Sequence, residues 1–363
     1  MNNKQSKMTF VTGATGFIGS RLCLELLRRG RSLVLLCRPE SMRRLHRWIE
    51  LLPRVFPSPV IVAGDLRREN LGLGKRDKEL VSRDVWEVFH VAASYHLSMG
   101  EQEAQETNVE GTERVLNLAS GIKALNRFHH VSSIDVSGDF QGEFFESDLD
   151  RGQGFVYPYS RSKFLSEQLV RKSSLPHTIY RPGVVVGDSI TGEMDKVDGL
   201  YYVFRILSSL LRIPGARMMP MLVPKSSDDA FSVVPVDYLV KAMAYLSDLE
   251  KSLSKTYHLV DPNPMSFRQL YLSILDEMGF IGPRIRRPVK RLVRLLMKPW
   301  LWPLAKKMGA YIDAPAEMLP HVLYLVRYDT TNALADLSGS GISCPPLKKY
   351  LNVLIEYYLS NLS

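Results

Sequence analysis

The sequence predicts an α/β protein with a Rossmann-like, doubly wound parallel sheet and a smaller C-terminal substrate lobe. Short apolar runs alternate with longer mixed segments through the first half, which is typical of repeated βαβ units. The runs are too apolar to leave one face in water, so we expect helices on both faces of the sheet. A glycine-rich turn directly after the first run completes the pattern.

Six runs in the first half are expected strands: Met8–Thr12, Ser32–Cys37, Val60–Ala63, Val85–Val91, Arg127–Ser132 and His177–Arg181. The segments Phe17–Arg29, Glu103–Ala119 and Tyr159–Arg171 are expected helices. Residues 1–186 are therefore predicted to form the sheet domain. Residues 187–363 are predicted to be a mixed region that forms the lobe. In that region, strands near 231–234 and 256–260 are expected to return to the core.

Composition is ordinary for a globular protein, with 363 residues, 45% of them hydrophobic and 23% charged. Cys23, Cys37 and Cys344 are far apart, so the sequence predicts neither a disulfide framework nor a metal site. The first strand begins at Met8, which leaves no room for a targeting leader, and no apolar run reaches the roughly 18 residues that a bilayer span requires. The expected location is the cytoplasm, with peripheral membrane association open.

A glycine-rich turn follows the first strand and precedes a helix, with Gly13, Gly16 and Gly19 as its glycines. Glycines at this spacing allow a tight turn, close approach of the backbone to a pyrophosphate and close packing of helix on strand. The helix N-terminus then directs amide hydrogens at phosphate oxygens. A purely structural turn is the alternative. We favour a dinucleotide site with contacts from Gly13, Thr15, Gly16, Phe17, Ile18 and Gly19.

The end of the second strand bears on the choice between NAD and NADP. A carboxylate there holds the ribose 2′-hydroxyl of NAD, whereas a guanidinium suits the 2′-phosphate of NADP. Arg38 and Ser41 occupy this place, so NADP(H) is favoured over NAD(H), although Glu40 argues the other way. Arg43 and Arg44 follow closely, and for Arg44 an ordinary solvated charge is the simpler interpretation.

A tyrosine and a lysine four residues apart, Tyr159 and Lys163, share one face of an expected helix. A tyrosine with a pKa near 10 is a poor base at neutral pH, and a neighbouring ammonium favours its phenolate. Such a pair arises by chance in a chain of this size, so its context decides. Ser132 and Ser133 end the preceding strand, at the sheet edge where ligands bind in such folds. Ser133 is the preferred candidate for holding the substrate oxygen, with Ser132 as the alternative.

The ordered set of motifs resembles the extended short-chain dehydrogenases/reductases, within the NAD-dependent epimerase/dehydratase superfamily. The set comprises the glycine turn, Gly64-Asp65-Leu66, His90-Val-Ala92-Ala93, Asn108-Val-Glu-Gly-Thr112, Val-Ser-Ser133, Tyr159-x-x-x-Lys163 and Arg181-Pro182-Gly183. The resemblance is close over about residues 8–190.

The resemblance implies a role for each matching residue. Ser133 would position the substrate, Tyr159 would be the acid/base, and Lys163 would lower the tyrosine pKa and bind the nicotinamide ribose. Asn108 would shape the site and take part in cofactor binding. Further cofactor contacts would come from Asp65, Leu66, Ala92, Ala93, Pro182, Gly183 and Val184.

Within this family the sequence looks like the thioester and fatty acyl-CoA reductase branch. This resemblance rests on three segments: Leu36-Cys-Arg-Pro39, the stretch Arg181–Gly192 and Asp198-Gly-Leu-Tyr-Tyr202. Sugar-nucleotide enzymes usually have Asp near the end of the second strand and Tyr at the position of Ser137. Members of the reductase branch often have Thr at the position of Ser133, which is a departure here.

The implied function is an NADP(H)-dependent oxidoreductase that reduces a carbonyl or thioester of a lipophilic substrate, such as a fatty acyl-CoA or fatty aldehyde. One alternative is a sterol dehydrogenase or a nucleotide-sugar epimerase or dehydratase on the same fold. A second is a non-catalytic dinucleotide sensor, against which the tyrosine–lysine pair argues. The oligomeric state stays open, a homodimer included.

Residues 284–307 carry nine basic side chains and no acidic one, which equals the formal net charge of +9 for the whole chain. From Val289 the apolar positions fall on one helical face, and Trp300 and Trp302 follow. A basic amphipathic helix with adjoining tryptophans suits an anionic membrane surface. A packed helix with solvated charges is the alternative. Nucleic acid is disfavoured because the aromatic residues cluster at one end.

Overall fold

A seven-stranded parallel sheet forms the centre of the computed structural model, which describes residues 7–96, 99–195, 197–225, 230–311 and 326–362. The strand order is β11-β7-β5-β4-β1-β2-β3, and all neighbouring strands are parallel. The strands are β1 (Met8–Thr12), β2 (Ser32–Cys37), β3 (Val60–Ala63), β4 (Val85–His90), β5 (Arg127–Val131), β7 (His177–Pro182) and β11 (Thr256–Leu259). This arrangement confirms the predicted fold class.

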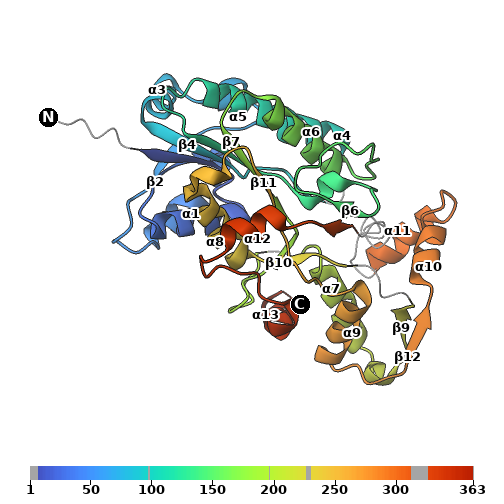
Figure 1. Ribbon diagram of the computed structural model, residues 1–363. Helices are drawn as coiled ribbons and strands as arrows, with labels where there is room; N and C mark the ends of the chain where they lie inside the picture. Colours follow the sequence, from blue (N-terminus) through green and yellow to red (C-terminus); the bar gives the residue numbers. More distant parts are fainter. Residues whose placement is uncertain (1–6, 97–98, 196, 226–229, 312–325, 363) are drawn as a thin grey trace.

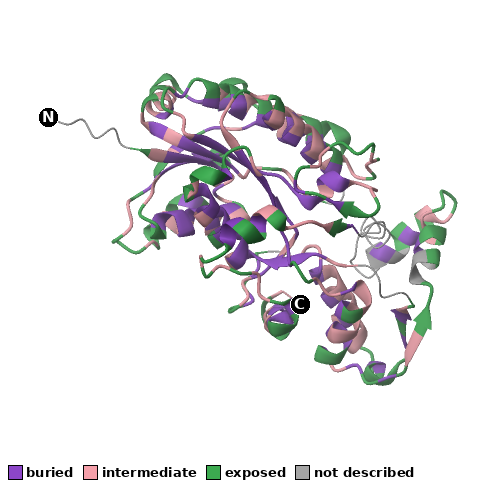
Figure 2. Cartoon of the chain, viewed as in Figure 1, coloured by how far each residue is buried: buried purple, intermediate pink, exposed green. Residues whose placement is uncertain are grey.

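Helices cover both faces of the sheet (Figure 1). One layer contains α3 (Lys75–Asp84), α5 (Glu110–Ser120) and α6 (Pro158–Lys172). The opposite layer contains α1 (Phe17–Arg28), α2 (Met42–Glu50), α8 (Val236–Asp248) and α12 (Thr331–Leu337). The central strands are mostly buried (Figure 2), and alternate side chains along them belong to two different hydrophobic clusters, which explains why the strands lack polar alternation.

The expected helix over Glu103–Ala119 is interrupted. It consists of α4 (Glu101–Ala104), a π-helical turn over Gln105–Val109 and α5 (Glu110–Ser120). A π turn inserts an extra residue into the helical ladder, and such turns are frequent at functional sites. The sequence prediction treated the whole segment as one regular helix and did not distinguish this turn.

The lobe beside the sheet has its own hydrophobic core. Its elements are α7 (Tyr201–Leu211), β9 (Met221–Pro224), α9 (Phe267–Glu277), β12 (Arg284–Arg287), α10 (Val289–Leu296), α11 (Trp302–Tyr311) and α13 (Leu351–Asn361). β12 pairs with β9, and Ser266 and Gln269 form a capping box that starts α9. Phe17 packs against both the lobe core and the core beneath the sheet, so α1 connects the two.

The chain after residue 186 contributes to both parts. β11 and the helices α8 and α12 belong to the sheet and its lower layer. β10 (Val233–Pro235) instead pairs with β8 (Val184–Val186) in a separate two-stranded sheet, and β6 (Glu143–Phe144) pairs with β13 (Arg327–Tyr328) in another. Within the described residues, no helix has both the length and the apolar character needed to cross a membrane.

Candidate active site

A cleft of about 1230 Å³ lies at the carboxyl edge of the parallel sheet, between the strand ends and the lobe. It opens beside β1 and β4, where the strand order reverses direction, which is the usual ligand position in open α/β sheets. All the predicted site residues except Asn108 line this cleft: Gly13, Thr15, Gly16, Phe17, Ile18, Gly19, Arg38, Ser41, Asp65, Leu66, Ala92, Ala93, Ser133, Tyr159, Lys163, Pro182, Gly183 and Val184.

The glycine turn forms one end of the cleft. Gly13 has a φ of +76°, and a Cβ atom there would lie 2.7 Å from the backbone nitrogen of Ala92. A Cβ atom on Gly19 would lie 2.0 Å from the carbonyl oxygen of Gly13. Only glycine therefore allows helix α1 to start this close to β1. The first-turn amides of α1 face a site from which side chains are excluded, which fits a pyrophosphate.

The end of β2 brings guanidinium groups to the same end of the cleft. Arg38, Arg44 and Arg67 line it together with Ser41. Arg44 donates a hydrogen bond to the carbonyl oxygen of Thr15, so the structure places it on the glycine turn, where the sequence favoured a solvated charge. Arg43 does not line the cleft.

The two carboxylates at this end are both held by arginines. The Arg38 Nε and a Glu40 carboxylate oxygen are 3.4 Å apart. Asp65 accepts from Arg67 at 2.7 Å, and this hydrogen bond is the main reason why the pKa of Asp65 is lowered. The arginines therefore partly neutralise these two carboxylates, and Glu103 and Glu106 add two further carboxylates to the lining of the cleft.

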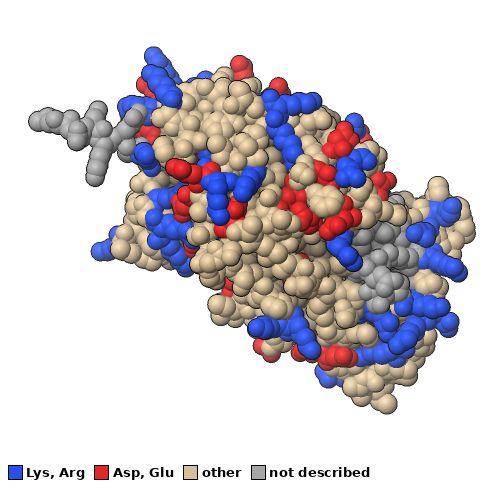
Figure 3. All heavy atoms as spheres, viewed as in Figure 1, with Lys and Arg blue, Asp and Glu red and all other residues tan. Residues whose placement is uncertain are grey.

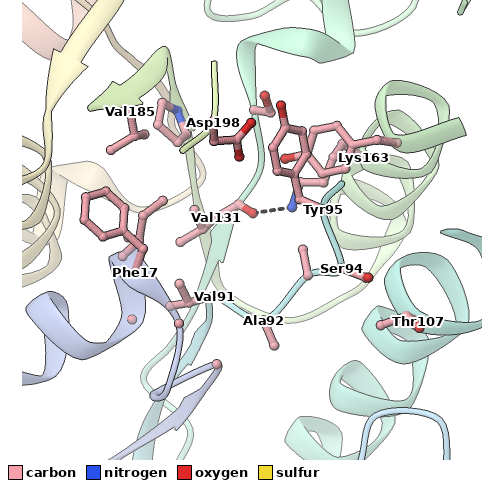
Figure 4. Close-up of a pocket in the computed structure, with 18 of the residues that line it drawn as sticks. Phe17, Val91, Ala92, Ser94, Tyr95, Thr107, Val131, Lys163, Val185 and Asp198 are labelled. Atoms are coloured by element: carbon pink, nitrogen blue, oxygen red, sulfur yellow. Dashed lines mark hydrogen bonds between the residues drawn. The ribbon is translucent and has the colours of Figure 1, made fainter. Parts of the chain in front are cut away.

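Ser133, Tyr159 and Lys163 meet on one wall of the cleft. The Lys163 ammonium donates to the carbonyl oxygen of Val131, the last residue of β5, at 2.6 Å, as the dashed line in Figure 4 shows. The Ser133 hydroxyl accepts from the backbone amide of Asp135 at 3.1 Å. The Tyr159 ring stands edge-on to Tyr95, with ring centroids 4.6 Å apart. Helix α6 and strand β5 thus place three polar groups around one point.

Burial controls the charges of this group. Burial raises the pKa of Tyr159, the nearby Asp135 raises it further, and a hydrogen bond with Ser133 opposes both. Burial lowers the pKa of Lys163 to about 8, against the opposing charges of Glu167 and Asp135. The tyrosine is therefore a neutral hydroxyl at neutral pH, in contrast to the phenolate that the tyrosine–lysine spacing favours. A neutral hydroxyl is ready to give a proton.

Asn108 is the predicted site residue that lies behind the cleft wall. It is buried in the π-helical turn, where its Oδ1 accepts from the amide of Ser94 at 2.8 Å. Its Nδ2 donates to the carbonyl oxygen of Ser94 and to the hydroxyl of Ser162 at 2.9 Å. Ser94 lines the cleft, and Ser162 precedes Lys163 on α6. Asn108 therefore connects two walls of the site.

A buried ion network behind the catalytic group was not predicted from the sequence. Glu167, one turn beyond Lys163 on α6, accepts from the Ser132 hydroxyl at 2.6 Å and from Arg181 at 2.7 Å. Arg181 also contacts His258 on β11 at 3.0 Å. The arginine charges outweigh burial and lower the pKa of Glu167 to about 2. The network joins α6 to the ends of β5, β7 and β11, and only the motif Arg181-Pro-Gly hinted at it.

The lobe supplies the opposite wall, which is mostly apolar. Its lining side chains are Met194, Leu200, Tyr202, Val203, Phe231 and Phe267, with Asp198 among them. Figure 4 shows Asp198 and Val185 across the cleft from Lys163. Sequence reasoning missed these residues because apolar side chains in a lobe have no spacing that separates a pocket lining from a core.

The male sterility protein family matches residues 11–243 of the chain. Relatives include the nonribosomal peptide synthetase asaC of Aspergillus flavus, 26% identical over 94% of this chain and 36% of that protein. Another is the aldehyde reductase lnaA of the same organism, 27% identical over 95% of this chain and 36% of that protein. The chain spans no more than about a third of the length of the relatives that it matches.

Solved structures share the fold over nearly the whole chain. The terminal R domain from the myxalamid PKS-NRPS biosynthetic pathway is 26% identical with a TM-score of 0.80, covering 99% of this chain and 92% of that domain. A UDP-glucose 4-epimerase from Thermotoga maritima is 17% identical with a TM-score of 0.64, covering 98% of this chain and 99% of that enzyme. The second likeness concerns the fold alone.

Proposed function

Because the chain belongs to the male sterility protein family, a reductase branch of the extended short-chain dehydrogenases/reductases, we propose that it reduces a thioester or aldehyde carbonyl with NADPH. The observation that carries the proposal is the meeting of Ser133, Tyr159 and Lys163 on a cleft with a glycine turn at one end. The apolar lobe wall supports a lipophilic substrate, such as a fatty acyl thioester or a long-chain aldehyde. The names of the aldehyde reductase and R-domain relatives support the same reaction class.

Each catalytic side chain has a role in this reaction. Reduced nicotinamide, when bound, supplies the hydride for the carbonyl carbon. Tyr159 donates its proton to the carbonyl oxygen, for which the neutral hydroxyl is the required form. Ser133 donates a second hydrogen bond to that oxygen. The positive charge of Lys163 stabilises the phenolate that the proton transfer leaves on Tyr159, and with a thioester substrate the thiol then leaves.

The choice of NADPH rests on the guanidinium groups of Arg38 and Arg44 beside Ser41. We expect Arg44→Ala to raise the KM for NADPH roughly 10- to 100-fold, because a charge-assisted hydrogen bond contributes about 1.5–3 kcal/mol. The KM for NADH should change little. Arg43→Ala is the matched control, since Arg43 is the adjacent exposed arginine and does not line the cleft. Equal losses for both cofactors would show that Arg44 supports the glycine turn through Thr15 and does not contact the 2′-phosphate, which would contradict the argument for NADPH.

The reaction is tested by NADPH oxidation with palmitoyl-CoA, a long-chain aldehyde and a ketosteroid in parallel. UDP-glucose is tested by product analysis, because its epimerisation consumes no net cofactor. We expect oxidation with the thioester or the aldehyde. Tyr159→Phe should lower turnover roughly 100- to 10,000-fold while NADPH still binds, because the ring remains and the proton donor is gone. Turnover of the steroid or the sugar nucleotide alone would replace the proposal with a dehydrogenase or epimerase. NADPH binding without any turnover would favour a sensor.

A further inference from the structure

The outer edge of the lobe combines basic and apolar side chains that the proposed reaction does not use. Figure 3 shows Lys and Arg side chains gathered over this part of the molecule. They come from β12, α10 and α11, where the exposed ones are Arg286, Arg287, Arg291, Arg294, Lys298, Lys306 and Lys307. None of these residues lines the cleft. The side chains of Val289, Lys290 and Leu292 lie outside the described part of the structure.

Large apolar side chains are exposed at two turns of the same edge. At the α10–α11 turn, Trp300 is 71% exposed and Leu304 is 49% exposed. At the α9–β12 turn, Ile281 is 77% exposed. The Ile281 amide bonds to the carbonyl oxygen of Arg217, which brings the 70% exposed Met218 beside it. Figure 1 shows the two turns at opposite ends of the edge formed by β12 and α10.

This arrangement differs from a helix that merely has solvated charges. On α10, Val293 is buried, whereas Leu295 is 46% exposed. The tryptophan, isoleucine and methionine at the turns are additional apolar surface, contributed by segments that are distant in sequence. Exposed apolar patches rimmed by charges mark interaction sites. Aromatic and aliphatic tips flanking a row of arginines suit the boundary between lipid headgroups and acyl chains.

We propose that this edge, defined by Met218, Ile281, Arg291, Arg294 and Trp300, docks the protein on an anionic lipid surface. The arginines and lysines meet the lipid phosphates, and the two apolar turns enter the interface. Charge complementarity favours a polyanionic partner, since residues 284–307 contain no acidic side chain. A nucleic acid backbone is bound through basic and polar side chains, so it would not account for the exposed Ile281 and Met218. The most exposed apolar side chains of this edge, Trp300, Ile281 and Met218, lie at the turns among basic side chains, and Leu295 on α10 and Leu222 on β9 are also partly exposed. Apolar side chains interspersed with basic ones suit a lipid interface better than the apolar centre of a protein interface, from which charged residues are depleted.

The test is flotation of the purified full chain with phosphatidylcholine vesicles that contain or lack phosphatidylglycerol. We expect binding only to the anionic vesicles and weakening with added salt. Arg291→Glu combined with Arg294→Glu should reduce binding roughly 30-fold or more, since each basic residue near such a surface contributes about one fivefold step and the substitutions also reverse the charge. Trp300→Ser combined with Ile281→Ser should reduce it roughly 10-fold through loss of apolar insertion.

Lys75→Glu combined with Arg76→Glu is the matched control, because it makes the same charge change at exposed positions of α3, away from the lobe. This pair should keep binding within about threefold of the original. Thermal melting of every variant separates lost docking from lost folding. If the control and the lobe variants lost vesicle binding to the same extent, binding would depend only on the net charge of the protein, and the proposal would be overturned. Binding to an acidic carrier protein with none to vesicles would also overturn it.

Discussion

Lys163 is a buried ammonium whose position stabilises the reaction at the expense of the fold. Burial lowers its pKa to about 8, whereas an unfolded chain gives a lysine a pKa of about 10.4. Folding therefore disfavours the charged lysine, which lowers the free energy of unfolding. This destabilisation is complete at pH values below the folded-state pKa. As the pH rises from about 8 to about 10.4, the unfolded chain retains a proton that the folded chain releases. The cost then disappears and stability from this group rises.

Lys163→Met is accordingly expected to abolish turnover and to raise the free energy of unfolding at pH 7. Two pKa units correspond to about 3 kcal/mol, from which the lost hydrogen bond to Val131 subtracts about 1 kcal/mol. A gain of about 2 kcal/mol is expected at pH 7, and it should vanish near pH 10. Urea unfolding at both pH values measures this. Lys172→Met, at an exposed position of the same helix, should show no such pH dependence. A methionine variant less stable than the original at pH 7 would contradict the argument.

Single residues were the scale at which sequence reasoning worked best for the cofactor end. Gly13 and Gly19 were recognisable from their spacing directly after the first strand, and the structure shows that a Cβ atom at either position would clash with backbone atoms. Arg44 is exposed, as a solvated charge would be, and its bond to Thr15 was not foreseen because it depends on how α2 sits against the glycine turn. The buried partnership of Glu167 with Arg181 joins residues on different elements, which apolar periodicity does not report.

At the scale of elements, the π-helical turn over Gln105–Val109 sets the position of Asn108. Its three hydrogen bonds to Ser94 and Ser162 hold the loop after β4 against α6, which carries Tyr159 and Lys163. Asn108→Ala should lower the free energy of unfolding by roughly 2–3 kcal/mol, at about 1 kcal/mol for each bond. It should also lower kcat roughly 10- to 100-fold by displacing the catalytic wall.

The readout that separates positioning from general destabilisation is the cofactor affinity. Asn108 does not line the cleft, so the Kd for NADPH should stay within about twofold while kcat falls. Asn117→Ala provides the comparison, because Asn117 is exposed on α5 just beyond the π turn. If the asparagine variant lost NADPH affinity and kcat to the same extent, Asn108 would be a cofactor ligand, as the family resemblance allows.

The strands and the sheet order show how far element prediction reaches. Apolar runs located the strands of the main sheet in the first half within a residue or two, because their short length and flanking turn residues are typical of strands rather than buried helices. The pairing of β10 with β8, outside the main sheet, was not foreseen. Partner choice depends on how the lobe folds back over Gly183, whose Cβ position is 2.7 Å from the carbonyl oxygen of Ser232. That contact is long-range and has no local signature.

At the scale of the whole molecule, the two hydrophobic cores are coupled rather than independent. Phe17 contributes to both. Arg21, on the same helix, pairs with Glu193 at 3.1 Å and with Asp195 at 3.2 Å at the base of the lobe. These ion pairs are partly exposed and contribute little individually, about 0–1 kcal/mol. The apolar contact through Phe17, together with β11 in the main sheet, is the stronger connection.

A coupled molecule should unfold in one transition, and the tryptophans allow this to be measured. Trp86 lies on β4 of the sheet, whereas Trp300 and Trp302 lie in the lobe. Variants that keep fluorescence from only one region should melt at the same temperature. NADPH at about 100 times its Kd should raise the free energy of unfolding by about 2.7 kcal/mol. Both melting midpoints should therefore rise together by roughly 3–4 °C. A midpoint that rises for Trp86 but not for the lobe tryptophans would show that the two parts unfold separately. Phe17→Ala is expected to produce that separation, because it removes the side chain that packs against both cores.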